Sequence, residues 1–328
     1  MRLFLHIGMA KTGSTAIQGA LARSRNLLAR QNAAYIGKQP VFAGDSGKDI
    51  PSYVRLSRQD PATQATLAEA FHAELAARHA AHGTATFVAS REGIVEWDLL
   101  PFVQRLGDLM DVRCIVYLRP ARPWLSSAYV QRALRNKSMP GPIPSFDEYV
   151  PELMGYYGRV KTWAETLGPG LLVREYRSDD IVADFAEATG LELRGAERRI
   201  HSTSEDAEIL LRTWFNSRFE AANGPAAFQD AVTPHGPLSA PRIDDMVARH
   251  LDHSSVDTHL ANQSEMLDYF RETHGIDLDP DSAPLKPGPD RAALRDRMLD
   301  MLIELQMQNA LRIFELEKQL AKANGPTG

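Results

Sequence analysis

Cysteine is almost absent from this 328-residue chain, which contains Cys114 alone. A single thiol excludes an intramolecular disulfide and fits a reducing compartment, so we expect a cytoplasmic protein. Long hydrophobic runs are also lacking, because no stretch approaches the roughly 18 apolar residues of a membrane span. We expect neither a transmembrane segment nor a signal peptide, since Lys11 interrupts the short apolar run at the N-terminus.

An excess of positive charge is missing too. The formal net charge is −5, which argues against a protein that binds nucleic acid over its whole surface. The histidines show no metal-site spacing: His72, His79 and His82 lie on an alanine-rich stretch, and no further ligand completes a site. We therefore expect no nucleic-acid partner and no bound metal.

The chain does contain short apolar strands that alternate with amphipathic helices. This alternation predicts an α/β fold, with a parallel sheet flanked by helices and a mainly helical C-terminal half. The predicted strands cover residues 3–7, 84–89, 112–118 and 171–173. The predicted helices cover residues 14–31, 62–81, 98–109, 123–136, 146–167 and 179–189, and helical signal continues over 204–274 with a break at 224–241. Loops are predicted at residues 37–61 and 137–145.

The proline-rich stretch at residues 279–289 predicts a linker. It separates a main domain, residues 1–278, from a long helix and tail, residues 290–328, whose helix is predicted to reach residue 323. Much of that helix is apolar. Three interpretations stay open: the helix packs back on the domain, it self-associates as a short coiled coil in a homo-oligomer, or it contacts a membrane surface.

Between the first predicted strand and helix lies a loop of the kind that binds phosphate, Gly8-Met9-Ala10-Lys11-Thr12-Gly13-Ser14-Thr15. A helix N-terminus offers unpaired N–H groups and a positive dipole end, and the two glycines let the backbone curl around an anion. In the nucleotide P-loop pattern G-x-x-x-x-G-K-[ST], Ser14 stands where the lysine belongs, and Lys11 stands three residues earlier. The alternative interpretation is a tight turn with an exposed lysine.

Two segments of the sequence resemble PAPS-dependent sulfotransferases, especially their bacterial carbohydrate-type branch. The segment from His6 to Thr15 resembles the family's 5′-phosphosulfate loop. The stretch from Tyr117 to Tyr129 resembles its 3′-phosphate motif, an arginine at a strand end with a serine eight residues later. The resemblance implies a P-loop-type sheet and the sulfuryl donor 3′-phosphoadenosine 5′-phosphosulfate (PAPS), whose product is adenosine 3′,5′-bisphosphate. It also implies that the reaction uses no metal.

The resemblance also implies roles for single residues. Lys11 would contact the leaving oxygen, and Arg119 with Ser127 would hold the 3′-phosphate, for which an arginine's planar fork and a serine hydroxyl are suited. The 5′-phosphate would be held by the remaining loop residues, Gly8, Thr12, Gly13, Ser14 and Thr15. Tyr176, which follows the fourth predicted strand, would lie near adenine; simple packing is the alternative.

Ser90-Arg91-Glu92-Gly93 ends the second predicted strand, and ligands bind at the carboxyl ends of parallel strands. Carbohydrate-type relatives often carry a glutamate here, which implies that Glu92 is the base that takes the acceptor proton. Alternatively, Glu92 caps the next helix or pairs with Arg91. His6, inside the first strand, is expected to pack rather than to catalyse.

Elsewhere the resemblance is loose, at residues 199–204 and near Ala261-Asn262-Gln263, and the cofactor lid of cytosolic relatives is absent. We expect a hydroxyl or amine acceptor, favouring a carbohydrate or glycoconjugate, and in-line transfer. A P-loop kinase or NTPase is one rival, although it needs a lysine at position 14 and an acidic residue at a strand end for magnesium. A non-catalytic nucleotide-binding scaffold is the other.

Overall fold

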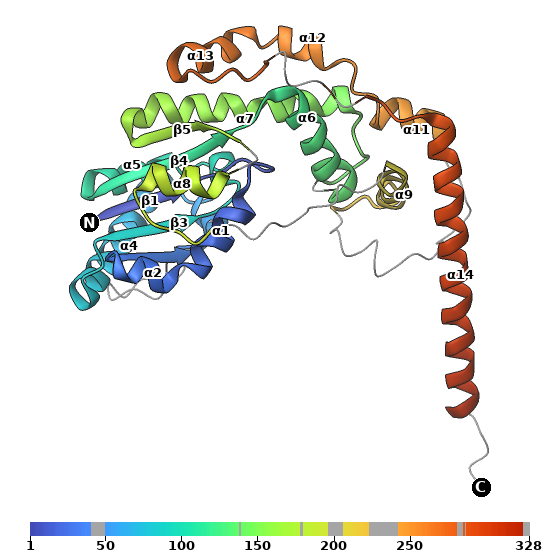
Figure 1. Cartoon of the computed structure of the whole chain (residues 1–328), viewed down its shortest axis with the longest axis horizontal. Helices are drawn as coiled ribbons and strands as arrows, with labels where there is room; N and C mark the ends of the chain where they lie inside the picture. The colour runs from blue at the N-terminus through green and yellow to red at the C-terminus, as the bar shows by residue number, and fades with distance from the viewer. Residues whose placement is uncertain are drawn as a thin grey trace. The chain divides into compact units, whose positions relative to one another are not determined.

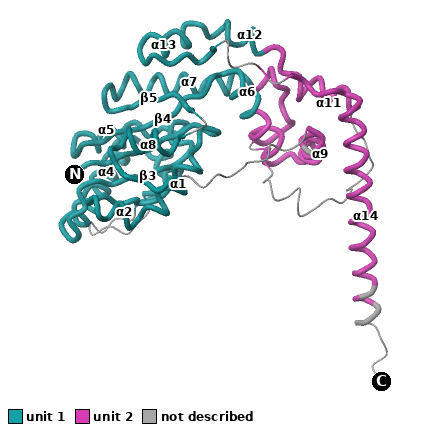
Figure 2. Tube along the Cα trace, viewed as in Figure 1, with its two compact units in different colours: residues 1–128, 150–200, 256–284 teal, residues 129–149, 201–255, 285–328 magenta. Residues whose placement is uncertain are grey.

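The structure is a computed structural model that describes residues 1–40, 50–137, 139–177, 180–195, 206–222, 242–280, 285 and 287–323. It divides into two compact units, shown in Figure 2. Unit 1 comprises Met1–Ala128, Val150–Ile200 and Val256–Pro284; unit 2 comprises Tyr129–Tyr149, His201–Ser255 and Leu285–Gly328. Two of the predicted features, the break at 224–241 and the segment at 199–204, lie outside the described residues.

Unit 1 is built on a five-stranded sheet whose strands are all parallel (Figure 1). The spatial order is β2-β3-β1-β4-β5. The strands are β1 (Arg2–His6), β2 (Ala33–Gly37), β3 (Thr86–Ser90), β4 (Asp111–Leu118) and β5 (Leu171–Glu175). The predicted α/β fold with a parallel sheet, helices and a C-terminal helix is confirmed.

Helices surround the sheet in unit 1 and make up the described secondary structure of unit 2 (Figure 1). Those lying mainly in unit 1 are α1 (Ser14–Arg23), α2 (Arg25–Arg30), α3 (Tyr53–Leu56), α4 (Pro61–His82), η1 (Ile94–Glu96), α5 (Leu100–Leu109), α6 (Ala121–Tyr129), α7 (Phe146–Leu167), η3 (Gly168–Gly170), α8 (Ile181–Thr189), α12 (Val256–Ala261) and α13 (Ser264–His274). Those of unit 2 are η2 (Val130–Arg135), α9 (Asp206–Asn216), α11 (Ile243–His250) and α14 (Arg291–Ala323). None of the described helices is long and apolar enough to cross a membrane.

Three local predictions need correction. Strand β2 was not predicted: it is a five-residue strand at the edge of the sheet, and after Ala33 its residues are only partly buried, so it lacks a clear apolar pattern. The helix predicted over residues 14–31 divides into α1 and α2 at Ser24, a buried residue whose hydroxyl accepts a hydrogen bond from the backbone of Arg194 at 2.8 Å. The loop predicted over residues 37–61 contains the short helix α3.

Alternate side chains of the strands pack against different helices, as the two-residue period of a strand requires. On one face, Phe4, Val88 and Ile115 form a core with residues of α1, α2 and α8. Elsewhere in unit 1, α4 packs against α5, which contacts β4. Cys114 of β4 is fully buried, and burial raises the pKa of its thiol to about 12, which fits an inert packed side chain.

Candidate functional site

The carboxyl ends of β1 and β4 lie next to each other in the middle of the sheet. His6 pairs with Ile115 in the strand register, and the N–H of Ile7 donates to the carbonyl of Ile115 at 2.9 Å. Both strands run in the same direction, so the segments that follow them leave the sheet at the same edge. The structure therefore brings the Gly8–Thr15 loop and Arg119 to one edge of unit 1, where open parallel sheets bind ligands.

The backbone of the loop turns through two residues of positive φ. Lys11 has a φ of 65° and Gly13 a φ of 80°. Positive φ suits glycine but costs a lysine about 1–3 kcal/mol, so the surrounding contacts must hold Lys11 in place. One such contact is internal: the hydroxyl of Thr12 donates to the carbonyl of Met9 at 2.7 Å. Gly13 is the N-cap of α1 and supplies no side-chain cap, and the first N–H groups of a helix have no acceptor within it.

Gly8 leaves room for two buried polar side chains. A Cβ at this position would lie 2.7 Å from Ser14 Oγ and 2.9 Å from His6 Cε1. Ser14 is 3% exposed, and neither its Oγ nor Nε2 of His6 has a hydrogen-bond partner among the described residues. Buried polar atoms are seldom left without partners. A buried hydroxyl without a partner among the described residues therefore stands at the start of α1, and helix N-termini are places where proteins bind anions.

Tyr176 connects the loop to Arg119. Its backbone N–H donates to the carbonyl of Leu118 at 2.6 Å, and its ring atom Cε2 lies 3.2 Å from the place that a Cβ on Gly13 would take. On the ring, the guanidinium carbon of Arg119 lies 5.7 Å from the centroid. Arg119 is half-buried, and no carboxylate in the described part of the chain forms an ion pair with it. The ring of Tyr176 thus contacts both candidate anion-binding elements.

Helix α6, which carries Ser127, is fixed to the loop by a tryptophan. Trp124 is fully buried, and its indole N–H donates to the carbonyl of Ala10 at 2.8 Å. Its ring packs edge-on against Tyr157, whose hydroxyl donates to the carbonyl of Arg119 at 2.8 Å. Trp124 and Tyr157 were not among the predicted site residues. Trp124 lies within the motif-like stretch, but nothing in the sequence indicates that its indole reaches the loop.

Glu92 lies in a turn that follows β3 and runs beside the start of the loop. The N–H of Arg91 donates to the carbonyl of His6 at 3.0 Å, and the N–H of Gly93 donates to that of Gly8 at 2.9 Å. Gly93, and not Glu92, is the N-cap of η1, and the Arg91 guanidinium lies 5.6 Å from the ring centroid of Trp97. The partly buried Glu92 is thereby placed near the start of the Gly8–Thr15 loop.

His6 is a fully buried imidazole that joins β1 to β3. Its Nδ1 lies 2.8 Å from Ser90 Oγ, and the rings of Tyr117 and Phe185 each have centroids 5.9 Å from its own. Desolvation by burial lowers the pKa of His6 to about 4, so its ring is neutral at pH 7. These contacts are those of a packed residue.

No three potential metal ligands gather within the described ranges. No protein-family model matches the chain, and no curated protein is similar enough in sequence to count as a relative.

The close contacts at Gly8 and the open space at Gly158 predict opposite effects on stability when each glycine is replaced by alanine. Gly8→Ala should lower the free energy of unfolding by about 1–3 kcal/mol, because its methyl group overlaps Ser14 and His6. Gly158→Ala, in the middle of α7 with nothing within 4 Å of the new Cβ, should raise it by roughly 0.5–1 kcal/mol. Urea unfolding measures both, and a neutral Gly8→Ala would show that the loop does not need this close approach.

The pKa of His6 predicts a loss of stability in acid. Between about pH 6.5 and pH 4 the unfolded chain binds a proton at His6 that the folded chain does not. The free energy of unfolding should therefore fall as the pH is lowered through this window, by up to about 3 kcal/mol from this group. Unfolding of the wild type and of His6→Asn at several pH values tests this. An unchanged slope in the variant would rule out His6 as the cause.

Proposed function

We propose that this chain is a sulfotransferase with a P-loop-type fold, which moves a sulfuryl group from PAPS to a hydroxyl or amine of a carbohydrate or glycoconjugate. The observation that carries the proposal is that the ring of Tyr176 contacts two elements: the N-terminus of α1, which has no side-chain cap and follows the Lys11 loop, and Arg119, which forms no ion pair among the described residues. A donor that carries phosphates on both the 3′ and the 5′ oxygen of its ribose needs two separate anion sites of this kind. The scarcity of cysteine favours the cytoplasm as its location.

The 5′ end of the donor is assigned to the loop. The hydroxyl proton of Thr12 is engaged by Met9, so Thr12 and Gly13 contribute backbone N–H groups to the phosphate. Ser14 contributes its unpaired hydroxyl, and the exposed Thr15 contributes its N–H and hydroxyl. Hydrogen bonds to a charged oxygen are worth about 1.5–3 kcal/mol each, so several of them fix the sulfate's position.

The 3′ end is assigned to Arg119 and Ser127. Arg119 follows β4 directly, and Ser127 lies in α6, which is held to the loop through Trp124. The guanidinium presents a planar fork to phosphate oxygens while its carbon lies over the ring of Tyr176. The aromatic ring also offers an apolar face to a purine, which is the role proposed for Tyr176.

The reaction is a single in-line displacement. The acceptor oxygen, or nitrogen, attacks the sulfur and forms a new bond as the bond from sulfur to the bridging phosphate oxygen breaks. That oxygen keeps the electron pair, and the Lys11 ammonium stabilises its developing charge. Glu92 removes the acceptor's proton, and adenosine 3′,5′-bisphosphate leaves. No step requires a metal.

Two features disfavour a kinase or NTPase. Ser14, buried beside Gly8, occupies the position of the P-loop lysine, and β4 is followed by Arg119 where a magnesium ligand would be acidic. Magnesium-dependent ATP hydrolysis would favour this rival. Binding of adenosine 3′,5′-bisphosphate without transfer to any acceptor would favour a scaffold.

Replacing Lys11 tests the catalytic role. Lys11→Gly should lower the rate of sulfuryl transfer at saturating donor at least about 100-fold, with a much smaller effect on donor affinity, because the charge acts on the leaving oxygen. Glycine accepts the positive φ, so the loop conformation is retained. Asn32→Gly, at another residue of positive φ, is the matched control and should keep full activity. Transfer from radiolabelled PAPS provides the measurement, and full turnover by Lys11→Gly would exclude this role.

Replacing Arg119 tests the second anion site. Arg119→Met should weaken binding of adenosine 3′,5′-bisphosphate about 10–100-fold, since it removes charge-assisted hydrogen bonds to the 3′-phosphate. Binding of adenosine 5′-phosphosulfate, which has no 3′-phosphate, should change little. Calorimetric titration of both nucleotides distinguishes a lost phosphate contact from a distorted site, because a distorted site would weaken both equally.

A further inference from the structure

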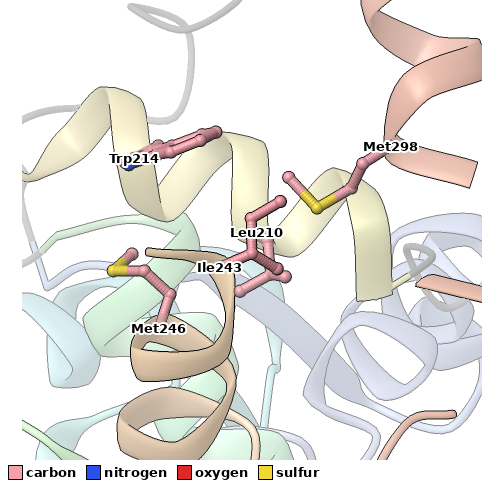
Figure 3. A pocket seen from close by; sticks show the side chains of 5 residues that line it. All are labelled: Leu210, Trp214, Ile243, Met246 and Met298. Carbon is pink, nitrogen blue, oxygen red and sulfur yellow. The ribbon is translucent and has the colours of Figure 1, made fainter. Parts of the chain in front are cut away.

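Among the described residues, the fully buried side chains of helix α14 lie in its first turns. Leu294 and Met298 are 5% and 2% exposed, and Arg295 forms an ion pair with Asp244 of α11 at 2.5 Å. Met298 closes a small apolar cluster between three helices, shown in Figure 3. Its other members are Leu210, Trp214, Ile243 and Met246. These contacts fix where the helix starts.

Immediately after Met298 the apolar side chains become exposed. Leu299 is 58% exposed and Leu320 is 61% exposed, and between them Met301 and Leu305 are half-buried. The other large apolar residues of this stretch are exposed: Leu302, Ile303, Met307, Leu311, Ile313, Phe314 and Leu316. Scattered exposed apolar residues are ordinary, but a concentration of this size on one helix marks an interaction surface.

When residues 299–320 are divided into heptads, five of the seven a and d positions, which form the seam of a coiled coil, carry apolar side chains. Leu299, Ile313 and Leu320 occupy a positions, and Leu302 and Leu316 occupy d positions. A β-branched residue at a with leucine at d, as at 313 and 316, favours two strands. The central a and d positions hold two amides, Gln306 and Asn309. A polar residue at a single a position can specify register and oligomer state at a cost in stability, and we extend this role to the pair of amides.

Charges beside the seam favour a parallel pair of helices. Arg312 is a g position and Glu317 is the e position of the following heptad, the two that face each other between parallel strands. In an antiparallel pair, Gln306 of one helix would face Asn309 of the other. Leu320 would then face Arg295, which already forms an ion pair with Asp244, and Arg312 would lie beside Leu305. The parallel arrangement pairs both the charges and the amides.

We propose that residues 299–320 of α14 form a parallel, in-register two-stranded coiled coil with a second copy of this chain. Leucine and isoleucine pack at the two ends of the seam. Each Gln306 and Asn309 meets its counterpart and fixes the register, and Arg312 of each copy pairs with Glu317 of the other. The proposal is independent of the function proposed above, because it involves no residue of the candidate site.

The mass of the full-length protein in solution tests the seam. The wild type should be a dimer by light scattering. Ile313→Asp and Leu316→Asp should each give a monomer with the circular dichroism spectrum of the wild type. Leu311→Asp and Phe314→Asp are matched controls: they are 65% and 63% exposed but lie at f and b positions, so both should stay dimeric. The proposal would be overturned if the wild type were a trimer or a monomer, including a monomer that binds lipid vesicles. It would also be overturned if the control variants dissociated like Ile313→Asp.

Cysteine and charge-reversal variants test the orientation. The protein's own Cys114 is fully buried, so a single introduced cysteine reports contacts between copies. Leu316→Cys should cross-link to itself on mild oxidation; cross-linking only with Leu299→Cys would instead establish the antiparallel pair. Arg312→Glu should weaken dimerisation about tenfold, and adding Glu317→Arg should restore it. Failure of the second change to restore the dimer would exclude the charge pairing.

Discussion

The candidate site depends on the pairing of β1 with β4 in a parallel sheet. Because the two strands are neighbours and end at the same edge, the loop after one and the arginine after the other are delivered to the same place. Tyr176 arrives there from β5 and is hydrogen-bonded to the end of β4. Three segments distant in sequence thus meet because of strand order alone.

Close packing then sets the shape of the loop. Gly8 permits the approach of Ser14 and His6, and the indole of Trp124 holds the crown of the loop at Ala10. Lys11 remains at a positive φ that an unconstrained lysine would avoid. Strain of this kind is retained where surrounding contacts determine it, and such residues cluster at functional sites. The buried, neutral His6 contributes packing beneath the loop rather than charge.

Regular periodicity made much of the fold predictable from sequence. The bounds predicted for α7 agree with the structure, and the predicted C-terminal helix starts within one residue of α14. Both helices are long and are bounded by proline or glycine, so their apolar periodicity distinguishes them from strands and loops. Strand β2 was missed since a short edge strand is only half-buried. The break at Ser24 depends on a hydrogen bond from the distant Arg194, which no local pattern reveals.

The residues of the candidate site could be predicted from the sequence, but the contacts that join them could not. The loop could be chosen from its glycine pattern between a predicted strand and a predicted helix. Arg119 and Glu92 also follow predicted strands, but their roles came from the resemblance to sulfotransferases. The contacts of the Tyr176 ring with Gly13 and Arg119, and the hydrogen bond from Trp124 to the loop, are tertiary contacts that only the folded chain displays.

The most direct measurement of the central claim compares the affinities of the wild-type protein for adenosine 3′,5′-bisphosphate and for adenosine 5′-monophosphate. Two anion sites joined by one nucleotide require that the 3′-phosphate add about 1.5–3 kcal/mol of binding free energy, or roughly 10–150-fold in the dissociation constant. Equal dissociation constants for the two nucleotides would contradict the account, because Arg119 would then contribute nothing to a shared site.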